Sequence, residues 1–361
     1  IRDRLRSRGL GDVYKRQWER STVMECNITR RNHYIPRFYL KNWSLDGRTI
    51  HTYSILVSNA KVPYWTQQSI KNTAIWNDFY TRLEGGKEID DFEHWFNREF
   101  EAPSKPIFVK LLSGQKISRE ESIILSHFVF AQYVRTPAAY IRMSEQSAQL
   151  FPKMIDETVS KLNKEAQRIK RGGLSPQLKN VTKDNLFPMR VNVDKENSAV
   201  EIIAIVGRGL YLHNLKRLLT STLKVVEHHD WQVIHASEDV SFPTSDDPVI
   251  CMNYRNEYDY DFNGGWGRKK CNIIMPLSPH SILFTQVGER GPYNGLNYSP
   301  KYSQLFRRMI IQHAHRYVYA ERPQRGMLEL NARIVNRDLY EREKQCVAGW
   351  HIEQIRAEQN L

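Results

Sequence analysis

The chain has 361 residues, of which 40% are hydrophobic and 26% are charged, and its formal net charge is +13. This composition argues against a chain that is disordered throughout, and the length allows one large domain or two modest ones. The longest apolar runs, such as 202–206 and 273–277, fall well short of the roughly 20 residues that a membrane-spanning helix needs. These short runs predict no membrane segment. The four cysteines form no Cys-x-x-Cys motif, which predicts reduced cysteines in the cytosol.

Part of the positive charge lies at the start of the chain. The first seventeen residues hold six basic and two acidic residues, so the remainder carries +9. Residues 12–17, Asp-Val-Tyr-Lys-Arg-Gln, match the translation of a common sequencing-library transposon adaptor. We therefore expect residues 1–23 to be a non-native leader, with Met24 as the natural start. The alternative is a basic arm that binds nucleic acid.

Residues 32–43, Asn-His-Tyr-Ile-Pro-Arg-Phe-Tyr-Leu-Lys-Asn-Trp, combine large apolar side chains with a histidine. They predict a buried helical turn that begins at Pro36, where no amide proton is needed. His33 is a candidate general base or metal ligand. The alternative is a buried histidine with one satisfied hydrogen bond.

The next segments alternate between strand and helix patterns. Residues 49–57 are β-branched and alternating, which predicts a hairpin strand after the Asp46-Gly47 turn. Asp90 is a candidate N-cap for a helix through Phe100. Pro103 and Pro106 should interrupt that helix before it resumes over 107–112.

Residues 118–121, Ser-Arg-Glu-Glu, form a capping box that opens the most apolar helix of the chain. That helix is apolar on nearly every side and ends near Arg135. A buried guanidinium needs an acidic partner because it cannot lose its charge, so we expect a contact with Asp246, directly or through His33. Glu93 and Asp78 are rival partners. Alternatively, Arg135 completes the helix C-terminus or clamps an anion.

The second half of the chain is predicted to be richer in strands. We expect a helix over 138–170 that Pro152 kinks, a loop over 174–197 and a helix over 199–226. Strands at 232–236, 249–253, 272–275 and 281–286 follow, and then a helix at 301–315, a strand at 316–320 and a helix from 327. The predicted fold class is α+β: helices packed on one mainly antiparallel sheet, with residues 24–361 as a single domain and compact unit.

The turn at 244–248, Thr-Ser-Asp-Asp-Pro, places hydroxyl and carboxylate groups between two strands. Asp246 is therefore a candidate catalytic acid, with an Asx-turn as the structural alternative. His228, His229, Asp230 and His235 lack any standard ligand spacing, so we expect no metal site there. The chain has no P-loop, Gly-x-Gly-x-x-Gly, His-Glu-x-x-His or Gly-x-Ser-x-Gly motif, and its cofactors stay unassigned.

Four segments together carry a family resemblance: 32–43, Arg-Thr-Pro at 135–137, 244–249, and Pro-Leu-Ser-Pro at 276–279. With them the chain resembles, over about residues 31–320, the bacterial family called domain of unknown function 4238. Asp246 matches the acid of that family's usual Thr-Ser-Asp-Asn-Pro pattern, whereas Asp247 stands where asparagine is commoner. The resemblance implies no settled activity.

Two classes of function remain open. The first is an enzyme, such as a hydrolase of nucleic acid or another phosphoester, that uses His33, Arg135 and Asp246. The second is a non-catalytic protein that binds nucleic acid or another partner through basic residues at two tips: Arg168, Lys170 and Arg171, and Arg268, Lys269 and Lys270. An enzyme requires His33, Arg135 and Asp246 to converge on one cleft, whereas a binding protein requires only an exposed basic face.

Overall fold

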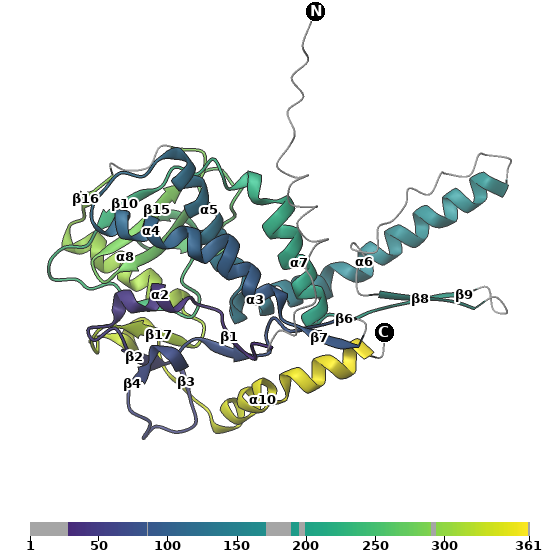
Figure 1. Cartoon of the computed structure of the whole chain (residues 1–361), viewed down its shortest axis with the longest axis horizontal. Coiled ribbons are helices and arrows are strands. Elements are labelled where there is room, and N and C mark those ends of the chain that lie inside the picture. The colour runs from purple at the N-terminus through teal and green to yellow at the C-terminus, as the bar shows by residue number, and fades with distance from the viewer. Residues whose placement is uncertain (1–27, 85, 171–188, 195–198, 290–293, 360–361) are drawn as a thin grey trace, which may run out of the picture.

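A computed structural model describes residues 28–84, 86–170, 189–194, 199–289 and 294–359, which form one α+β unit (Figure 1). The fold class predicted from the sequence is confirmed. The predicted leader over residues 1–23 and Arg171 lie outside the described residues. In the part of the chain that is described, no helix is both long enough and apolar enough to cross a membrane.

The strands form two main sheets among the described residues, not the single sheet that we predicted. The larger has the order β13 (Asp259–Asp261), β12 (Ile250–Asn256), β14 (Asn272–Ser278), β15 (Ser281–Gln286), β10 (Gln232–His235) and β16 (Leu296–Asn297). All of its pairings are antiparallel except that of β10 with β16. The smaller has the order β11 (Thr244–Ser245), β17 (Tyr317–Ala320), β2 (Thr49–Ser54) and β4 (Trp65–Ser69).

Short two-stranded ladders complete the strand set of the described residues. They pair β1 (Arg31–His33) with β5 (Ile75–Asn77), β3 (Leu56–Val57) with β18 (Ile334–Val335), β6 (Arg82–Glu84) with β7 (Lys87–Ile89), and β8 (Met189–Asp194) with β9 (Ala199–Ala204).

The α-helices, in chain order, are α2 (Arg37–Leu40), α3 (Asp91–Phe96), α4 (Ala102–Leu112), α5 (Arg119–Val134), α6 (Pro137–Lys170), α7 (Arg208–Ser221), α8 (Pro300–His313), α9 (Met327–Leu330) and α10 (Arg337–Gln359). The predicted capping box opens α5: the Ser118 hydroxyl accepts from the Glu121 amide, and the Glu121 carboxylate accepts from the Ser118 amide. Local sequence therefore sets the start of this buried helix.

Both faces of the larger sheet are buried, which explains the apolar runs of its central strands. Along β14, Ile273 and Met275 join the core that contains α5, whereas Ile274, between them, joins the core that contains α8. Successive side chains of a strand point to opposite faces, so one apolar run serves two cores. The helices α5 and α8 accordingly lie on opposite sides of this sheet (Figure 1).

The helix around residue 100 is not interrupted in the way that we predicted. A π-helical segment, Asn97–Glu101, joins α3 directly to α4, and Pro103 occupies the first turn of α4. Proline lacks an amide proton, and its ring crowds the carbonyl four residues earlier, so the wider π turn accommodates it without ending the helix. This segment sets the direction of the Glu101 side chain. Asp90 does not cap α3 with its side chain but accepts from the Thr29 amide.

The predicted helix over 199–226 is wrong in its first part, and the predicted loop over 174–197 is wrong in its last part. The strand β9 occupies Ala199–Ala204 and pairs with β8, and α7 begins only at Arg208. An apolar run of about six residues is compatible with either a strand or a helix, so the partner strand decides.

The C-terminal helix α10 packs on the core through aromatic side chains. Trp350 is buried and lies 5.1 Å from Tyr140, 5.3 Å from Trp76 and 5.9 Å from Phe79 between ring centroids. Its indole nitrogen donates to the Asp78 carbonyl (3.4 Å). The helix is therefore part of the packed unit, as Figure 1 shows.

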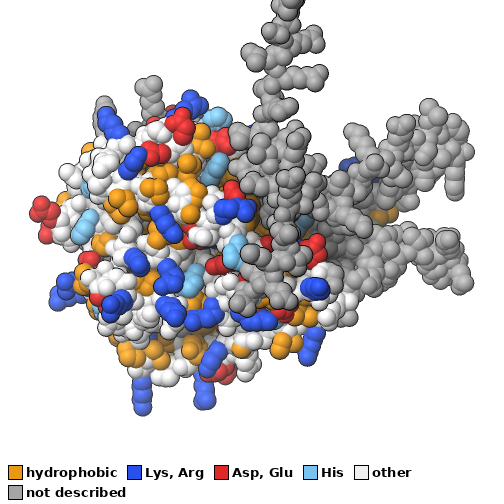
Figure 2. Space-filling view, viewed as in Figure 1, with side chains coloured by type: hydrophobic (Ala, Val, Ile, Leu, Met, Phe, Trp, Pro, Cys, Tyr) orange, Lys and Arg blue, Asp and Glu red, His pale blue; other side chains and the backbone are white. Residues whose placement is uncertain are grey.

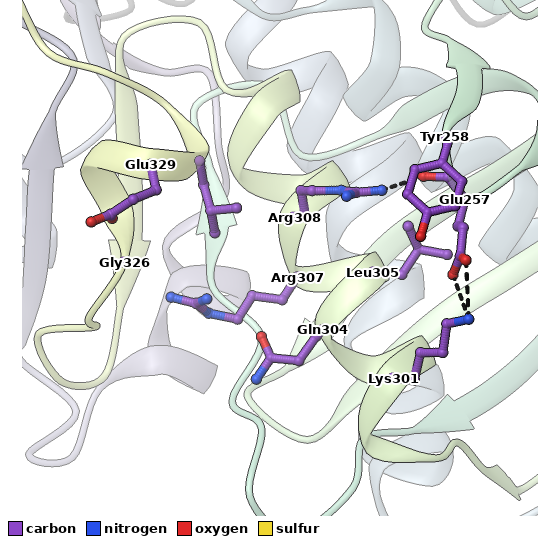
Figure 3. Close-up of a pocket in the computed structure, with 10 residues that line it drawn as sticks. Glu257, Tyr258, Lys301, Gln304, Leu305, Arg307, Arg308, Gly326 and Glu329 are labelled. Atoms are coloured by element: carbon purple, nitrogen blue, oxygen red, sulfur yellow. Dashed lines mark hydrogen bonds and ion pairs between the residues drawn. The ribbon is translucent and has the colours of Figure 1, made fainter.

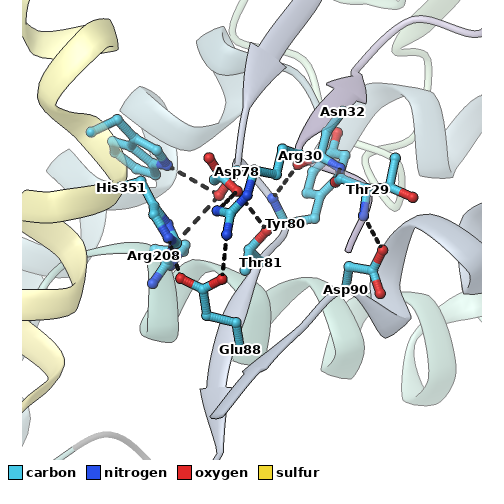
Figure 4. A network of polar contacts seen from close by, with 11 residues as sticks. Thr29, Arg30, Asn32, Asp78, Tyr80, Thr81, Glu88, Asp90, Arg208 and His351 are labelled. Atoms are coloured by element: carbon cyan, nitrogen blue, oxygen red, sulfur yellow. Dashed lines mark hydrogen bonds and ion pairs between the residues drawn. The ribbon is translucent and has the colours of Figure 1, made fainter. Parts of the chain in front are cut away.

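A polar network around Asp78 attaches the same helix to the core (Figure 4). The Arg208 side chain is fully buried and forms an ion pair with Glu358 (2.9 Å). It also bonds His351, whose other ring nitrogen contacts Glu88 at 2.6 Å. The charge of the Arg208 guanidinium is therefore neutralised by a carboxylate of α10, as a buried cation requires.

We predict that Trp350→Ala lowers the free energy of unfolding by about 3–5 kcal/mol, because it removes a buried aromatic side chain from α10. Urea denaturation measures this loss. The matched control is Ile352→Ala on the same helix, whose side chain is 56% exposed and whose loss should stay within about 0.5 kcal/mol. Equal effects of the two substitutions would contradict the docking of α10.

Candidate functional site

The opening segment, residues 32–43, is hydrogen-bonded to the two main sheets through Tyr39. Its phenolic oxygen lies 2.8 Å from the Thr244 hydroxyl and donates to the Pro276 carbonyl at 2.8 Å. Asn42 and Trp43 donate to the carbonyls of Leu277 and Phe242. Three segments that are far apart in the sequence therefore meet at one buried point, and the contacts that join them are structural.

The junction between α5 and α6 divides the polar groups into two clusters. Arg135 contacts Glu101, whereas the hydroxyl of Thr136 donates to Asp247 at 2.9 Å. We call the first group, Arg135, Gln132, Glu101, Glu93 and His33, the Arg135 cluster. The second group, Asp246, Asp247, Thr136, Arg142 and His313, is the Asp247 cluster.

Arg135 is enclosed by its partners. Only 2% of its side chain is exposed, and its Nη1 donates to Glu101 Oε1 at 2.8 Å. Nε and Nη2 both donate to the Gln132 side-chain oxygen, and the guanidinium lies 5.1 Å from the Phe96 ring centroid. Burial is the largest single influence on the Arg135 pKa and lowers it, but Glu101, Tyr80 and Glu93 together raise this pKa above its ordinary value. Arg135 therefore positions Glu101 and has little capacity left for a substrate.

Glu93 is the carboxyl group of this cluster with the most useful chemistry. Burial raises its pKa to about 7; Arg135 opposes the rise and Glu101 adds to it. The carboxylate accepts from the Asn32 side chain at 3.4 Å and from the main-chain amide of His33. A partly exposed carboxyl group that titrates near neutrality can exchange protons with a bound molecule.

His33 lies half-buried beside the same ion pair. Burial, together with Arg37, lowers its pKa, so the imidazole is neutral at pH 7. The ring bonds the Lys71 main chain, and its Nε2 is buried without a hydrogen-bond partner among the described residues. In the tautomer whose ring N–H is on Nδ1, Nε2 can accept a hydrogen bond.

The Asp247 cluster lies across the α5–α6 junction. The Asp246 carboxylate accepts from the main-chain amides of His315 (2.9 Å) and Arg316 (2.8 Å). Burial, with a contribution from Asp247, raises the Asp246 pKa to about 7 in spite of these bonds. Asp246 thus fixes the connection between α8 and β17.

Asp247 links three elements of the fold. Its Oδ2 lies 2.6 Å from Arg142 Nη1 on α6 and 3.8 Å from His313 Nε2 on α8. Its Oδ1 accepts from Thr136. The Nη2 of Arg142 is buried with no hydrogen-bond partner in the described part of the chain. The cluster joins the long helix to the end of α8.

A sequence model described as a protein of unknown function (DUF4238) matches residues 31–324. The chain belongs to this family. No curated protein and no solved structure matches the chain. The resemblance recognised from the four motifs is confirmed, and the whole of α10 lies beyond the matched residues.

The structure brings together two of the three candidate catalytic residues of this DUF4238 protein. Arg135 forms an ion pair with Glu101, and Glu101 also acts on the His33 pKa. The predicted contact between Arg135 and Asp246 is wrong, because Arg135 bonds Glu101 and Gln132, whereas Asp246 bonds main-chain amides. The rival Glu93 lies in the Arg135 cluster.

The sequence reasoning missed Glu101 and Arg142. Glu93 and Glu101 lie eight residues apart, a spacing that shares one helical stripe, and this signal could have indicated Glu101. Arg142 had no such signal, because its partner Asp247 is 105 residues away in the chain.

The predicted basic tips stay predictions in this DUF4238 protein. Arg268, Lys269 and Lys270 are exposed, and Lys269 lies 3.6 Å from Glu289. The residue of this segment with a positive φ is Lys270 (φ 68°) and not one of its glycines. Gly264 serves a different need, since a Cβ there would lie 2.5 Å from Cys271 Sγ. Arg168 and Lys170 belong to the last turn of α6.

The described residues contain no group of three or more His, Cys, Asp or Glu side chains that could hold a metal ion. In segment 228–235, which we considered as a metal site, the two ring nitrogens of His229 contact the carbonyls of Val226 and Trp266. These bonds give His229 a structural role.

We predict that Arg135→Met and Glu101→Gln are coupled in stability. Each single change leaves a buried polar or charged group without its partner, so the double variant should lose less than the sum of the singles by about 0.5–3 kcal/mol. Urea denaturation of the four proteins in the cycle measures this coupling. In the matched cycle, Arg135→Met and Asp246→Asn should add within about 0.5 kcal/mol. Coupling in the second cycle but not the first would show that the partners are assigned wrongly.

Proposed function

We propose that this DUF4238 protein is a hydrolase of phosphoesters, with nucleic acid as the substrate class, and that Glu93 is its general base. One observation carries the proposal: a partly exposed carboxyl group whose pKa is about 7 lies beside a buried ion pair and a neutral histidine. Such perturbed groups concentrate at functional sites.

The surface around the Arg135 cluster supports an anionic substrate. Arg37 and Arg31 both act on the His33 pKa and are exposed. Lys105 is exposed one turn after Glu101, with its ammonium group 5.6 Å from the Phe38 ring centroid. Lys and Arg side chains also gather over the region of α2 and β1 on the face that Figure 2 shows. Such cations would hold phosphate groups near the carboxyl group.

In the proposed reaction, Glu93 takes a proton from a water molecule while the oxygen of that water attacks phosphorus. A new P–O bond forms, the bond to the leaving oxygen breaks, and that oxygen leaves with a proton from solvent. The free Nε2 of His33 would accept a hydrogen bond from a substrate group that enters beside Glu101. Arg135 and Glu101 act as positioning residues, and Asp246 keeps a structural role in this proposal.

We expect the purified protein to cleave RNA, DNA or bis(p-nitrophenyl) phosphate, assayed with EDTA and with Mg²⁺. Glu93→Gln should lower the turnover rate by about 100-fold or more, because it removes the proton acceptor. Glu99→Gln, which changes a partly buried carboxylate paired with Arg98, is the control and should keep full activity. No cleavage of any of the three substrates would contradict the proposal.

The pH profile gives an independent check. Glu93 must be deprotonated to act as a base, so the rate should rise with pH through about 7, the pKa of this group. Below that pH the carboxyl group is protonated, and the rate should fall about tenfold for each pH unit. A rate that does not change between pH 5.5 and 8.5 would remove Glu93 from the mechanism.

Binding of nucleic acid without catalysis is the second candidate function, supported by the exposed cluster Arg268, Lys269 and Lys270. Replacing all three by glutamine should weaken binding to a DNA duplex and reduce its salt dependence, because phosphate contacts release counterions. Fluorescence anisotropy at several salt concentrations measures both effects. Identical curves for the two proteins would leave this cluster as ordinary surface.

A further inference from the structure

A pocket of about 390 Å³ lies over α8, and none of its lining residues belongs to either polar cluster (Figure 3). Arg307 and Gln304 line one part of it, and Lys301, Arg308 and Glu257 line another. Leu305 and Leu330 supply apolar surface between them. The volume falls within the range of small-molecule sites, roughly 300–1,000 Å³.

Arg307 is a half-buried cation whose hydrogen-bond partners in the described part of the chain are neutral. Its Nε donates to the Gln324 side-chain oxygen at 2.9 Å, and its Nη2 donates to the Arg325 carbonyl at 2.6 Å. Burial lowers the Arg307 pKa, whereas carboxylates raise the pKa of Arg135 and Arg142. A guanidinium stays protonated in proteins, so Arg307 keeps its charge, and among the described residues it forms no ion pair with a carboxylate.

The pocket lining carries three cations, Lys301, Arg307 and Arg308, against two carboxylates, Glu257 and Glu329. Glu257 is paired with Lys301 at 2.8 Å. Arg308 donates to the Glu257 carbonyl and lies 5.6 Å from the Tyr260 ring centroid. Its Nε is buried and has no hydrogen-bond partner in the described part of the chain. With Glu257 paired to Lys301, the remaining lining charges are the guanidinium groups of Arg307 and Arg308 and the carboxylate of Glu329, a balance that favours an anion.

The geometry points to the α8 pocket as a binding site for a small organic anion, a carboxylate or a phosphate monoester on a ring-sized apolar body. The oxyanion would bind Arg307 and the amide of Gln304, which point to the same side of α8 in Figure 3. The apolar body would cover Leu305 and Leu330. Arginine suits such a ligand because its planar fork matches the oxyanion geometry.

Isothermal titration calorimetry of the full chain tests this assignment. Benzoate and phenylphosphonate, which the proposed hydrolase cannot cleave, should bind, whereas the neutral benzyl alcohol should not. Glu93→Gln should bind both anions with unchanged affinity, so the result is separate from the proposed function. Absence of binding of either anion at millimolar concentration would overturn the proposal, and so would equal binding of the alcohol.

Two variants locate the site. Arg307→Gln should lower the affinity for both anions at least tenfold. Because this change also disturbs the bonds to Gln324 and Arg325, Gln304→Glu is the second variant: it adds a negative charge at an exposed residue and should reduce binding as strongly. Arg322→Gln changes an exposed residue and should bind like the parent. Unchanged affinity of both pocket variants for the two anions would overturn the proposal. It would also be overturned if the variants kept their affinity for the anions and lost binding only to a DNA oligonucleotide.

Discussion

One charge that cannot be removed organises the centre of this protein. Arg135 ends a helix that is buried on nearly all sides, so its guanidinium must be neutralised inside the core. The π-helical segment delivers Glu101 to Arg135, and Gln132 bonds both Arg135 and the Tyr34 carbonyl. The compensation of a single cation therefore joins the opening segment, α5 and the helix that contains Glu93.

The family motifs mainly hold elements together. Tyr39 meets Thr244 and the Pro276 carbonyl, and Thr136 meets Asp247. An asparagine in place of Asp247, the commoner residue in the pattern of the resembled family, could accept the Thr136 hydroxyl. It could not neutralise Arg142, so the aspartate of this chain adds an ion pair. The reactive groups, Glu93 and His33, lie beside this framework and depend on it for their position.

Local signals in the sequence were reliable where they were complete. The capping box of α5, the long helix α6 and the antiparallel strands β14 and β15 follow the predicted ranges closely. The signals failed where a segment depends on a partner. The β-branched run at 199–204 is a strand because β8 pairs with it, and Pro103 does not break its helix because a π turn precedes it.

The sequence by itself predicted that Arg135, if buried, would need an acid, because the helix before it is apolar on nearly every side and arginine stays charged. It left three acids eligible: Asp246, Glu93 and Asp78. Only the tertiary structure chose Glu101, because the direction of that side chain depends on a π turn and on how α3, α4 and α5 pack. Asp246 instead accepts hydrogen bonds from the main-chain amides of residues 315 and 316. These bonds depend on the position of α8 relative to β17, which the sequence alone does not give.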